Sequence, residues 1–137
     1  MKQLKIHKWL IALLCLVALL GFTGCEDGDK APAPAPENIA GIWSYTLTGN
    51  SPNRGPFTSQ GTMTIKQSGQ NVSGSYAWAD DKVYTFSGTY IDGTLNAVDS
   101  DAWTLNISFS GDSAAGTITG IYASSGAPGV ESLSMSR

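Results

Sequence analysis

The segment Asn71–Gly93, with the sequence NVSGSYAWADDKVYTFSGTYIDG, carries the clearest structural signal of this chain. Apolar and polar residues alternate along it in two runs, which the polar residues 80–82 separate. One face would carry Val72, Gly74, Tyr76 and Trp78 in the first run and Tyr84, Phe86, Gly88 and Tyr90 in the second. A period of two residues with one apolar face is typical of antiparallel strands that face the core on one side and water on the other. The segment therefore predicts two such strands joined by a turn.

The same alternation continues through residues 39–137, where no window shows the period of a helix. Eight strands are predicted, over residues 41–48, 59–67, 71–79, 83–91, 94–98, 102–110, 116–123 and 131–136. Asp92-Gly93, between two of them, is a strong signal for a two-residue hairpin, because glycine accepts the positive φ of a type I′ turn. All six prolines fall outside these ranges, as expected of a residue that cannot donate to a sheet. Residues 39–137 thus predict one all-β domain of ordinary size.

Evenly spaced strands with short connections indicate an eight-stranded antiparallel up-and-down barrel, which is the fold class that we predict. A two-sheet sandwich would bury a similar set of residues and is the alternative. The predicted inward-facing residues are Trp43, Tyr45, Leu47, Met63, Ile65, Val72, Tyr76, Trp78, Tyr84, Phe86, Tyr90, Leu95, Trp103, Leu105, Ile107, Phe109, Ile118, Tyr122, Leu133 and Met135. This inner set contains no acidic residue, whereas the outer faces are mostly Ser, Thr and Asn, which suits a solvated wall.

Residues 1–24 have the organisation of a secretory signal peptide, with three lysines before an apolar run that is shorter than the roughly 18 residues of a membrane span. The sequence Phe22-Thr23-Gly24-Cys25 resembles the lipobox of bacterial lipoproteins. The resemblance implies cleavage before Cys25, a diacylglyceryl group on its sulfur and an acylated amino terminus. We therefore expect a lipoprotein of the bacterial cell envelope that is anchored to the lipid bilayer through acylated Cys25. Glu26 favours the outer membrane, and an ordinary secretory signal or an uncleaved anchor is the alternative.

Cleavage would change the composition of the chain. It would remove the only histidine, His7, and leave five basic and eleven acidic residues, a net charge of −6. This balance argues against a nucleic-acid partner, which requires basic surface. Residues 25–38 contain the Ala-Pro repeat Ala31–Pro36, which favours extended polyproline II and predicts a semi-rigid tether between the lipid and the domain.

A Ser/Thr-Gly-x-Tyr pattern recurs at residues 73–76, 87–90 and 119–122. In each copy the glycine and the tyrosine have the same parity and would both face inward. Glycine in a strand permits a sharp bend and leaves space that a neighbouring aromatic ring can cover. The pattern therefore predicts curvature points of a small barrel, or space beside an aromatic wall, and the two interpretations are compatible.

The motif Gly41-Ile42-Trp43 at the start of the first strand resembles the Gly-x-Trp that opens lipocalins and avidins, together called calycins. The strands that are similar in order and style to the avidin barrel are 72–76, 86–90, 103–109 and 118–122. This resemblance implies a small ligand stacked among tryptophans, with Trp103 in the place of a pocket tryptophan and Tyr76 in that of a hydrogen-bonding tyrosine. Tyr45 replaces a short polar residue of avidins, and threonines surround the place of another pocket tryptophan, so we do not expect biotin as the ligand.

The residues left after cleavage limit the kinds of catalytic and metal site that the chain can form. Without histidine, and with Cys25 lipidated, the chain cannot form Cys-His dyads, Ser-His-Asp triads or histidine metal sites. The acidic clusters at 80–81 and 99–101 lie at predicted turns, where Asp is common, and neither supplies the six or more oxygens of a calcium loop. A two-carboxylate glycosidase needs inward-facing acids, which the predicted inner faces lack. We therefore predict a protein that is not an enzyme and that holds no cofactor or metal.

Two functions fit these constraints. The first is binding of a small apolar ligand inside a lipocalin-like barrel, for which the candidate residues are Trp43, Tyr45, Tyr76, Trp78, Trp103 and Tyr122. Eight-stranded barrels hold one small ligand or are filled by side chains. With a filled interior, the lipoprotein would instead interact with, or inhibit, a protein or glycan of the envelope. The candidate surface for this alternative is the predicted loop 49–58, where Arg54 and Phe57 would contact the partner.

Overall fold

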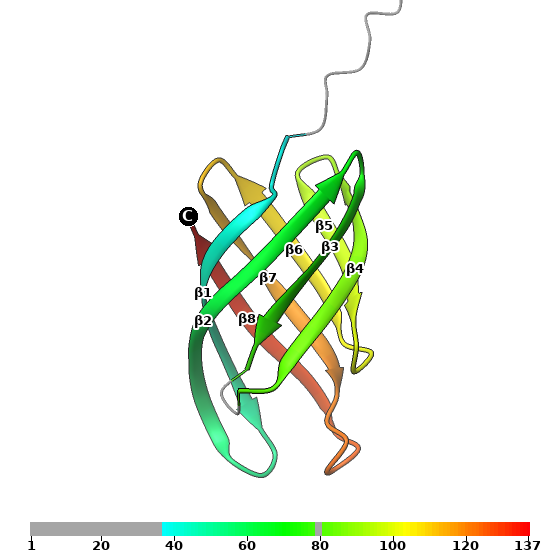
Figure 1. Ribbon diagram of the computed structural model, residues 1–137. Helices are drawn as coiled ribbons and strands as arrows, with labels where there is room; N and C mark the ends of the chain where they lie inside the picture. Colours follow the sequence, from blue (N-terminus) through cyan, green and yellow to red (C-terminus); the bar gives the residue numbers. More distant parts are fainter. Residues whose placement is uncertain (1–36, 79–80) are drawn as a thin grey trace, which may run out of the picture. The chain divides into compact units, whose positions relative to one another are not determined.

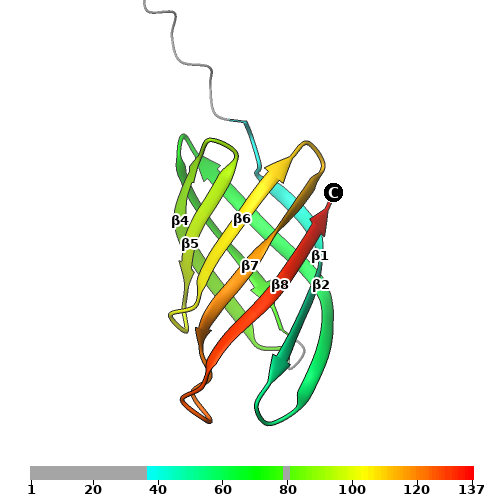
Figure 2. The same ribbon diagram turned by 180° about the vertical axis from the view of Figure 1, so that it is seen from behind.

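Eight antiparallel strands close into a barrel in the computed structural model, which describes residues 37–78 and 81–137 (Figure 1; Figure 2). The strands are β1 Gly41–Ser51, β2 Gly55–Ser68, β3 Asn71–Ala77, β4 Val83–Ile91, β5 Thr94–Asp99, β6 Thr104–Ser110, β7 Ser113–Ile121 and β8 Pro128–Ser136. Each strand pairs with the next along the chain, and β8 pairs with β1 to close the sheet. The predicted antiparallel up-and-down barrel is therefore confirmed, and the sandwich is excluded.

Part of the predicted organisation lies outside the described residues. This holds for the signal peptide 1–24, for Cys25 and for all of the tether except its last two residues. The described ranges contain no helix that is long and apolar enough to cross a membrane.

The turn at Asp92-Gly93 has the predicted two-residue geometry. Both residues have a positive φ, 49° for Asp92 and 80° for Gly93, as a type I′ turn requires. The ladder between β4 and β5 continues up to the pair Ile91 and Thr94, which flanks the turn. The hairpin signal in the sequence is therefore confirmed.

The hairpin of β1 and β2 is longer than predicted. The sequence predicts a loop over 49–58, whereas the two strands pair as far as Ser51 and Gly55. Gly55 takes a φ of 72°, a backbone conformation that lets the chain reverse within the three residues between the strands. Pro56 thus lies in β2 and Pro128 begins β8, so the prediction that every proline falls outside the strands is wrong. Both prolines are within the first two residues of their strands, where a missing N–H is tolerated.

Side chains that point into the barrel form its core, and burial alternates along the strands as predicted. In β6, for instance, Leu105, Ile107 and Phe109 are buried while the residues between them are exposed. Two acidic side chains, Asp99 and Glu131, are also buried on inner faces, so the prediction that these faces lack acids is wrong. Each has the parity of the apolar residues on its own strand. The alternation of the strand, and not the residue type, sets the direction of the side chain.

One end of the barrel is closed by the chain that enters it. Ile39 is 1% exposed, and its carbonyl accepts a hydrogen bond from Trp43 Nε1 at 2.9 Å. The Trp43 ring is fully buried, packs edge-on against Phe109 at a centroid distance of 5.1 Å, and carries the Arg137 guanidinium 4.6 Å from its centroid. The C-terminus lies at this same end (Figure 1).

Candidate ligand-binding site

The end of the barrel opposite Ile39 holds a cavity of about 350 Å³, which we call the mouth pocket. It is lined by Ser51, Asn53, Arg54, Phe57, Thr58, Trp78, Tyr84, Tyr122 and Ser124. Four of these side chains are aromatic, and the others are polar residues of the turns and of the adjoining ends of β1 and β2. Small-molecule sites typically measure roughly 300–1,000 Å³ and combine apolar walls with a few polar groups. The mouth pocket has the size and the lining of such a site.

The aromatic rings of the mouth pocket rest on one another in a continuous series of contacts. Trp78 lies at the centre, with ring centroids 6.2 Å from Phe57, 5.6 Å from Tyr84 and 5.8 Å from Trp103. Trp103 in turn meets the ring of Tyr122 edge-on at 5.1 Å. Edge-to-face pairs of this kind stabilise by about 0.5–1.5 kcal/mol beyond the area that they bury. These contacts stabilise the arrangement of the rings around the pocket.

Two glycines make room for the buried ring of Trp103 beneath the pocket. A Cβ at Gly120 would lie 2.3 Å from Trp103 Cδ2, and one at Gly129 would lie 2.6 Å from Trp103 Cη2. The same Gly129 position is 2.6 Å from Tyr122 Cε2, so the two rings share the space that the missing side chains leave. Gly120 belongs to the third copy of the Ser/Thr-Gly-x-Tyr pattern. In that copy the glycine provides space that an aromatic ring covers.

Asp99 is a buried acid whose two carboxylate oxygens are both partnered. Oδ1 accepts the backbone N–H groups of Asp101 and Trp103, each at 2.9 Å, and Oδ2 accepts the Tyr76 hydroxyl at 2.6 Å. Burial, with the hydrogen bond to Asp99 as the second cause, raises the pKa of Tyr76. Asp101 binds Lys82 Nζ at 2.6 Å. In residues 37–78 and 81–137 no group of three His, Cys, Asp or Glu side chains could hold a metal ion. The hydrogen bond from the Trp103 N–H to Asp99 Oδ1 instead indicates that Asp99 positions Trp103.

Glu131 is the second buried acid, and it is only half satisfied. The side chain is 0% exposed, and Oε1 accepts a hydrogen bond of 2.9 Å from the Tyr122 hydroxyl. Oε2 is buried and has no hydrogen-bond partner among the described residues. Burial raises the pKa of Glu131 to about 7, with a smaller upward contribution from Asp99 and an opposing one from the Tyr122 hydrogen bond. A buried group that lacks a partner and has a shifted pKa is a candidate functional group.

The residues predicted for the two alternative functions meet at the same place. Trp78 and Tyr122, from the predicted barrel interior, line the mouth pocket together with Arg54 and Phe57, from the predicted partner surface. The Phe57 ring is half-buried, because β2 begins earlier than predicted and directs this side chain inward over the barrel end. The two hypotheses therefore concern one site.

The other predicted interior residues lie at different depths. Tyr76 and Trp103 are buried in the layer beneath the pocket, where Tyr76 stacks on Tyr84 at 5.4 Å and so supports its wall. Trp43 lies at the closed end of the barrel, and Tyr45 lies on the wall, where its hydroxyl donates to a backbone carbonyl. Whether any of the predicted residues contacts a ligand stays a prediction.

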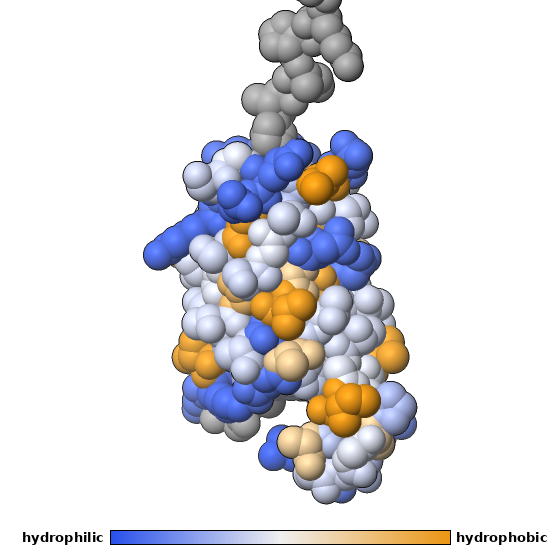
Figure 3. Space-filling model, turned by 90° about the vertical axis from the view of Figure 1, so that its right-hand side faces the viewer, coloured by the Kyte–Doolittle hydropathy of each residue, from blue (hydrophilic) through white to orange (hydrophobic). Residues whose placement is uncertain are grey.

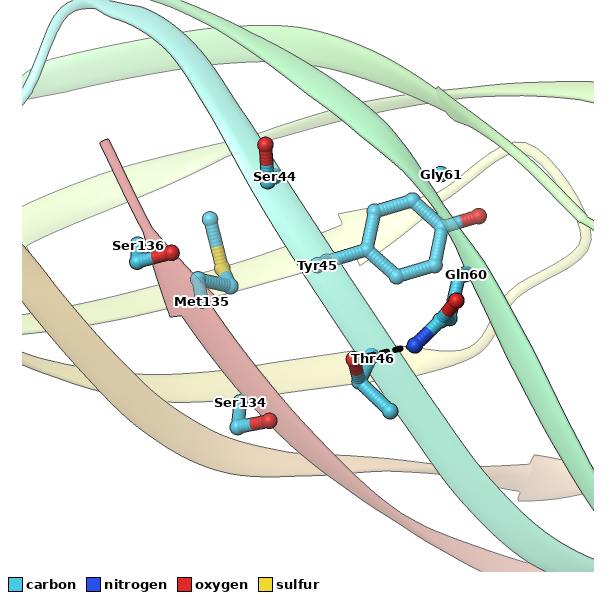
Figure 4. Close-up of a pocket in the computed structure, with 8 residues that line it drawn as sticks. All are labelled: Ser44, Tyr45, Thr46, Gln60, Gly61, Ser134, Met135 and Ser136. Atoms are coloured by element: carbon cyan, nitrogen blue, oxygen red, sulfur yellow. Dashed lines mark hydrogen bonds between the residues drawn. The ribbon is translucent and has the colours of Figure 1, made fainter.

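A larger hollow, of about 570 Å³, lies on the outside of the barrel between β2, β1 and β8 (Figure 4). It is an open groove lined by Ser44, Tyr45, Thr46, Gln60, Gly61, Ser134, Met135 and Ser136. Its exposed side chains are hydroxyls and one amide, with Gln60 Nε2 donating to Thr46 Oγ1 at 3.5 Å. The ring of Tyr45 covers Gly61, where a Cβ would lie 2.8 Å from the tyrosine oxygen (Figure 4). Because this groove offers a ligand little apolar surface, we place the candidate site in the mouth pocket.

The outer wall is otherwise polar, with single apolar residues among hydroxyl and amide side chains. Figure 3 shows them scattered over the face that it presents. The exposed large apolar residues are Ile42, Val83, Ile91, Val98, Ile121 and Val130. Scattered apolar residues are ordinary on protein surfaces.

Several residues of the site region were not among the predicted site residues: the polar lining residues Ser51, Asn53, Thr58 and Ser124, the ring of Tyr84, and the buried acids Asp99 and Glu131. Tyr84 is in the predicted inner set, but nothing in the sequence marks it as lining a pocket. Asp99 and Glu131 share the parity of buried neighbours on β5 and β8, and that alternation was the signal that could have found them. Comparison of the sequence with protein-family models and with curated proteins gave no match. The fold and the geometry of the mouth pocket are therefore the observations that bear on function.

Proposed function

We propose that this protein is a non-catalytic, lipid-anchored lipoprotein of the bacterial cell envelope that binds a small, mostly apolar ligand in the mouth pocket. The observation that carries the proposal is the cavity of about 350 Å³ with four aromatic side chains around it, in a barrel whose opposite end is closed. Apolar walls with a few polar groups at the rim are what small-molecule sites have in common. A kinship with calycins is part of the proposal, and the motif Gly41-Ile42-Trp43 and the eight-stranded barrel support it.

The anchor in this proposal is the lipid on Cys25. The lipobox-like sequence before Cys25 supports it, and so does the Ala-Pro repeat that would act as a tether. The chain joins the barrel at the closed end, where the Gln67 side chain accepts a hydrogen bond from the Ile39 N–H and donates one to the Glu37 carbonyl. Two or more acyl chains hold a small domain to a bilayer stably, because each buried CH₂ contributes ~0.8 kcal/mol.

The anchor is tested by labelling cells that express the full chain with a palmitate analogue and fractionating them. The wild-type protein should carry the label and sediment with membranes, and Cys25→Ala should lose both properties. An unlabelled wild-type protein in the periplasmic or cytoplasmic fraction would contradict the lipoprotein assignment.

The pocket is tested by titrating the full chain with the apolar fluorescent probe 1-anilinonaphthalene and following tryptophan fluorescence. Trp78→Ala should weaken binding by about tenfold, since one aromatic wall is worth on the order of 1–3 kcal/mol. The control is Ile42→Ala, which removes an apolar side chain of the outer wall that is 67% exposed. Equal affinities for wild type and both variants would place the probe outside the mouth pocket.

The alternative is that Arg54 and Phe57 bind a protein or glycan of the envelope. Arg54 is exposed on the β1–β2 turn, which suits a contact with a partner. Phe57, however, packs against Trp78 and lines the cavity. In this position its ring is better placed to contact a ligand inside the pocket than a partner protein at a flat interface. We therefore favour the small ligand.

A further inference from the structure

We infer that the mouth pocket takes a small organic cation, with an aromatic or alicyclic body and a protonated amine, and that Glu131 binds the amine. This inference rests on the proposed ligand-binding function and specifies the class of the ligand. Its basis is a carboxylate whose second oxygen has no partner, placed under an aromatic pocket.

The carboxylate of Glu131 has more capacity for hydrogen bonds than the fold uses. The side chain is 0% exposed, Tyr122 donates to Oε1, and Oε2 is left without a donor among the residues described. Leaving a buried carboxylate oxygen unpartnered is costly, and native proteins do so rarely. A glutamine at this position would accept the same hydrogen bond from Tyr122 without a charge. The acid is therefore in excess of what the fold requires.

Glu131 lies against two side chains that line the pocket. Tyr122 contributes its ring to the lining and its hydroxyl to the carboxylate. Phe57 and Glu131 lie together over Gly49, where a Cβ would be 2.8 Å from Phe57 Cζ and 2.9 Å from Glu131 Cγ. The absence of a side chain at Gly49 is what lets the carboxylate and the aromatic ring approach each other. Glu131 does not itself line the pocket, so in this proposal the amine displaces the Phe57 ring or the Tyr122 hydroxyl to reach Oε2.

The chemistry around the carboxylate favours a cation over a neutral or anionic head group. Aromatic faces attract ammonium groups, as the Lys82 ammonium 4.6 Å from the Tyr84 ring centroid shows in this barrel. Trp78 and Tyr122 supply two further rings of the same pocket. Residues 37–137 include four basic and eight acidic side chains, a net charge of −4, which draws cations toward the barrel. Arg54 is at the solvent side of the rim. An ammonium group would donate the missing hydrogen bond to Oε2 and would place a positive charge beside the negative carboxylate.

The experiment compares three ligands of one skeleton that differ only in the head group: tryptamine, tryptophol and indole-3-propionate, with the phenyl series phenethylamine, phenethyl alcohol and 3-phenylpropionate beside them. Binding to the full chain is measured by calorimetry at about pH 8, where the raised pKa of Glu131 still leaves it mostly ionised and the amines are protonated. We expect an amine to bind about tenfold or more tightly than the matching alcohol and carboxylate. Glu131→Gln should abolish this preference.

The matched control is Glu37→Gln, which removes an acidic charge at the closed end of the barrel, where Glu37 contacts the Tyr90 hydroxyl at 3.3 Å. It should keep the preference for the amine, since only the local carboxylate is involved. Alcohols or carboxylates that bind the mouth pocket as tightly as amines, with sensitivity to Trp78→Ala, would overturn the ligand class and leave the proposed function standing. Absence of binding by all six compounds and by 1-anilinonaphthalene would overturn both.

The pH dependence of the wild type tests the role of Glu131 without any variant. The titratable groups around Glu131 are Tyr122, Asp99 and Tyr76, and burial raises the pKa of Glu131 itself to about 7. Because only the ionised carboxylate attracts the ammonium, amine affinity should fall about tenfold per pH unit well below that value, while alcohol affinity stays constant. An amine preference that is independent of pH between about pH 5 and pH 8 would remove Glu131 from the site.

Discussion

The hydroxyl of Tyr122 joins the mouth of the barrel to its buried acid. The ring of Tyr122 lines the pocket, and its hydroxyl donates to Glu131 Oε1 at 2.9 Å. Burial, together with this hydrogen bond to Glu131, raises the pKa of Tyr122 to about 12, so the hydroxyl remains a donor at any physiological pH. The orientation of one wall of the pocket therefore depends on an acidic side chain that the fold itself would not need.

Glu131 should make the barrel less stable as the pH rises. Its pKa is about 7 in the folded protein and 4.5 as a reference, so the unfolded chain ionises first and stability falls as the pH rises from about 4.5 to somewhat above 7. The full shift corresponds to about 3 kcal/mol at most. Urea unfolding at about pH 5 and pH 8 should show this loss in the wild type, and a flatter profile in Glu131→Gln. Parallel profiles would mean that the carboxyl is not perturbed.

Asp99 should matter as a hydrogen-bond acceptor that positions Trp103, and its negative charge should matter less. Asp99→Ala removes the acceptor of two backbone N–H groups and of the Tyr76 hydroxyl, so we expect a loss of about 2–4 kcal/mol in the free energy of unfolding. Asp99→Asn keeps one carbonyl oxygen and should lose less. Urea unfolding followed by tryptophan fluorescence measures both. A larger loss for Asn than for Ala would contradict a positioning role.

Gly120 should not tolerate a side chain. A methyl group there would lie 2.3 Å from Trp103 Cδ2, so Gly120→Ala has to displace the ring, at a cost of about 1–3 kcal/mol. The displaced ring would also disturb the Trp103–Tyr122 contact and weaken ligand binding. Ser132→Ala, on the exposed face of β8, is the control and should change stability by less than about 0.5 kcal/mol. Thermal unfolding of the two variants beside the wild type is sufficient, and equal midpoints would refute the packing argument.

Arg137 should stabilise the closed end without affecting the mouth. Its guanidinium lies 4.6 Å from the Trp43 centroid, and Nε donates to Asp112 Oδ1 at 3.0 Å. Arg137→Ala should therefore lower the free energy of unfolding by about 1 kcal/mol, and its affinity for a mouth-pocket ligand should equal that of the wild type. Denaturation and calorimetry on the same preparation check the two statements. A change in affinity would show that the two ends of the barrel are coupled.

Much of the fold could be read from local pattern, because strand alternation depends on the direction of each side chain relative to its neighbours. Leu105, Ile107 and Phe109 face the core as their spacing predicts, and the Asp92-Gly93 turn has the predicted backbone. The same rule would have placed Asp99 and Glu131 inside. Asp99 instead falls in a predicted turn after residue 98, and Glu131 is missing from the predicted inner set, whereas the alternation along β5 and β8 directs both side chains inward.

The sequence therefore established the all-β class, the number of strands and most of the inner faces, since these follow from neighbours along the chain. The tertiary structure settled which inward residues share a site. An inward residue near the start of β1, such as Trp43, lies at one end of the barrel, and Phe57, early in β2, lies at the other. Their separation depends on how strands pair, and the cavity depends on how side chains fill the space between them. Neither quantity is local in sequence, because both arise only when distant strands close into one barrel.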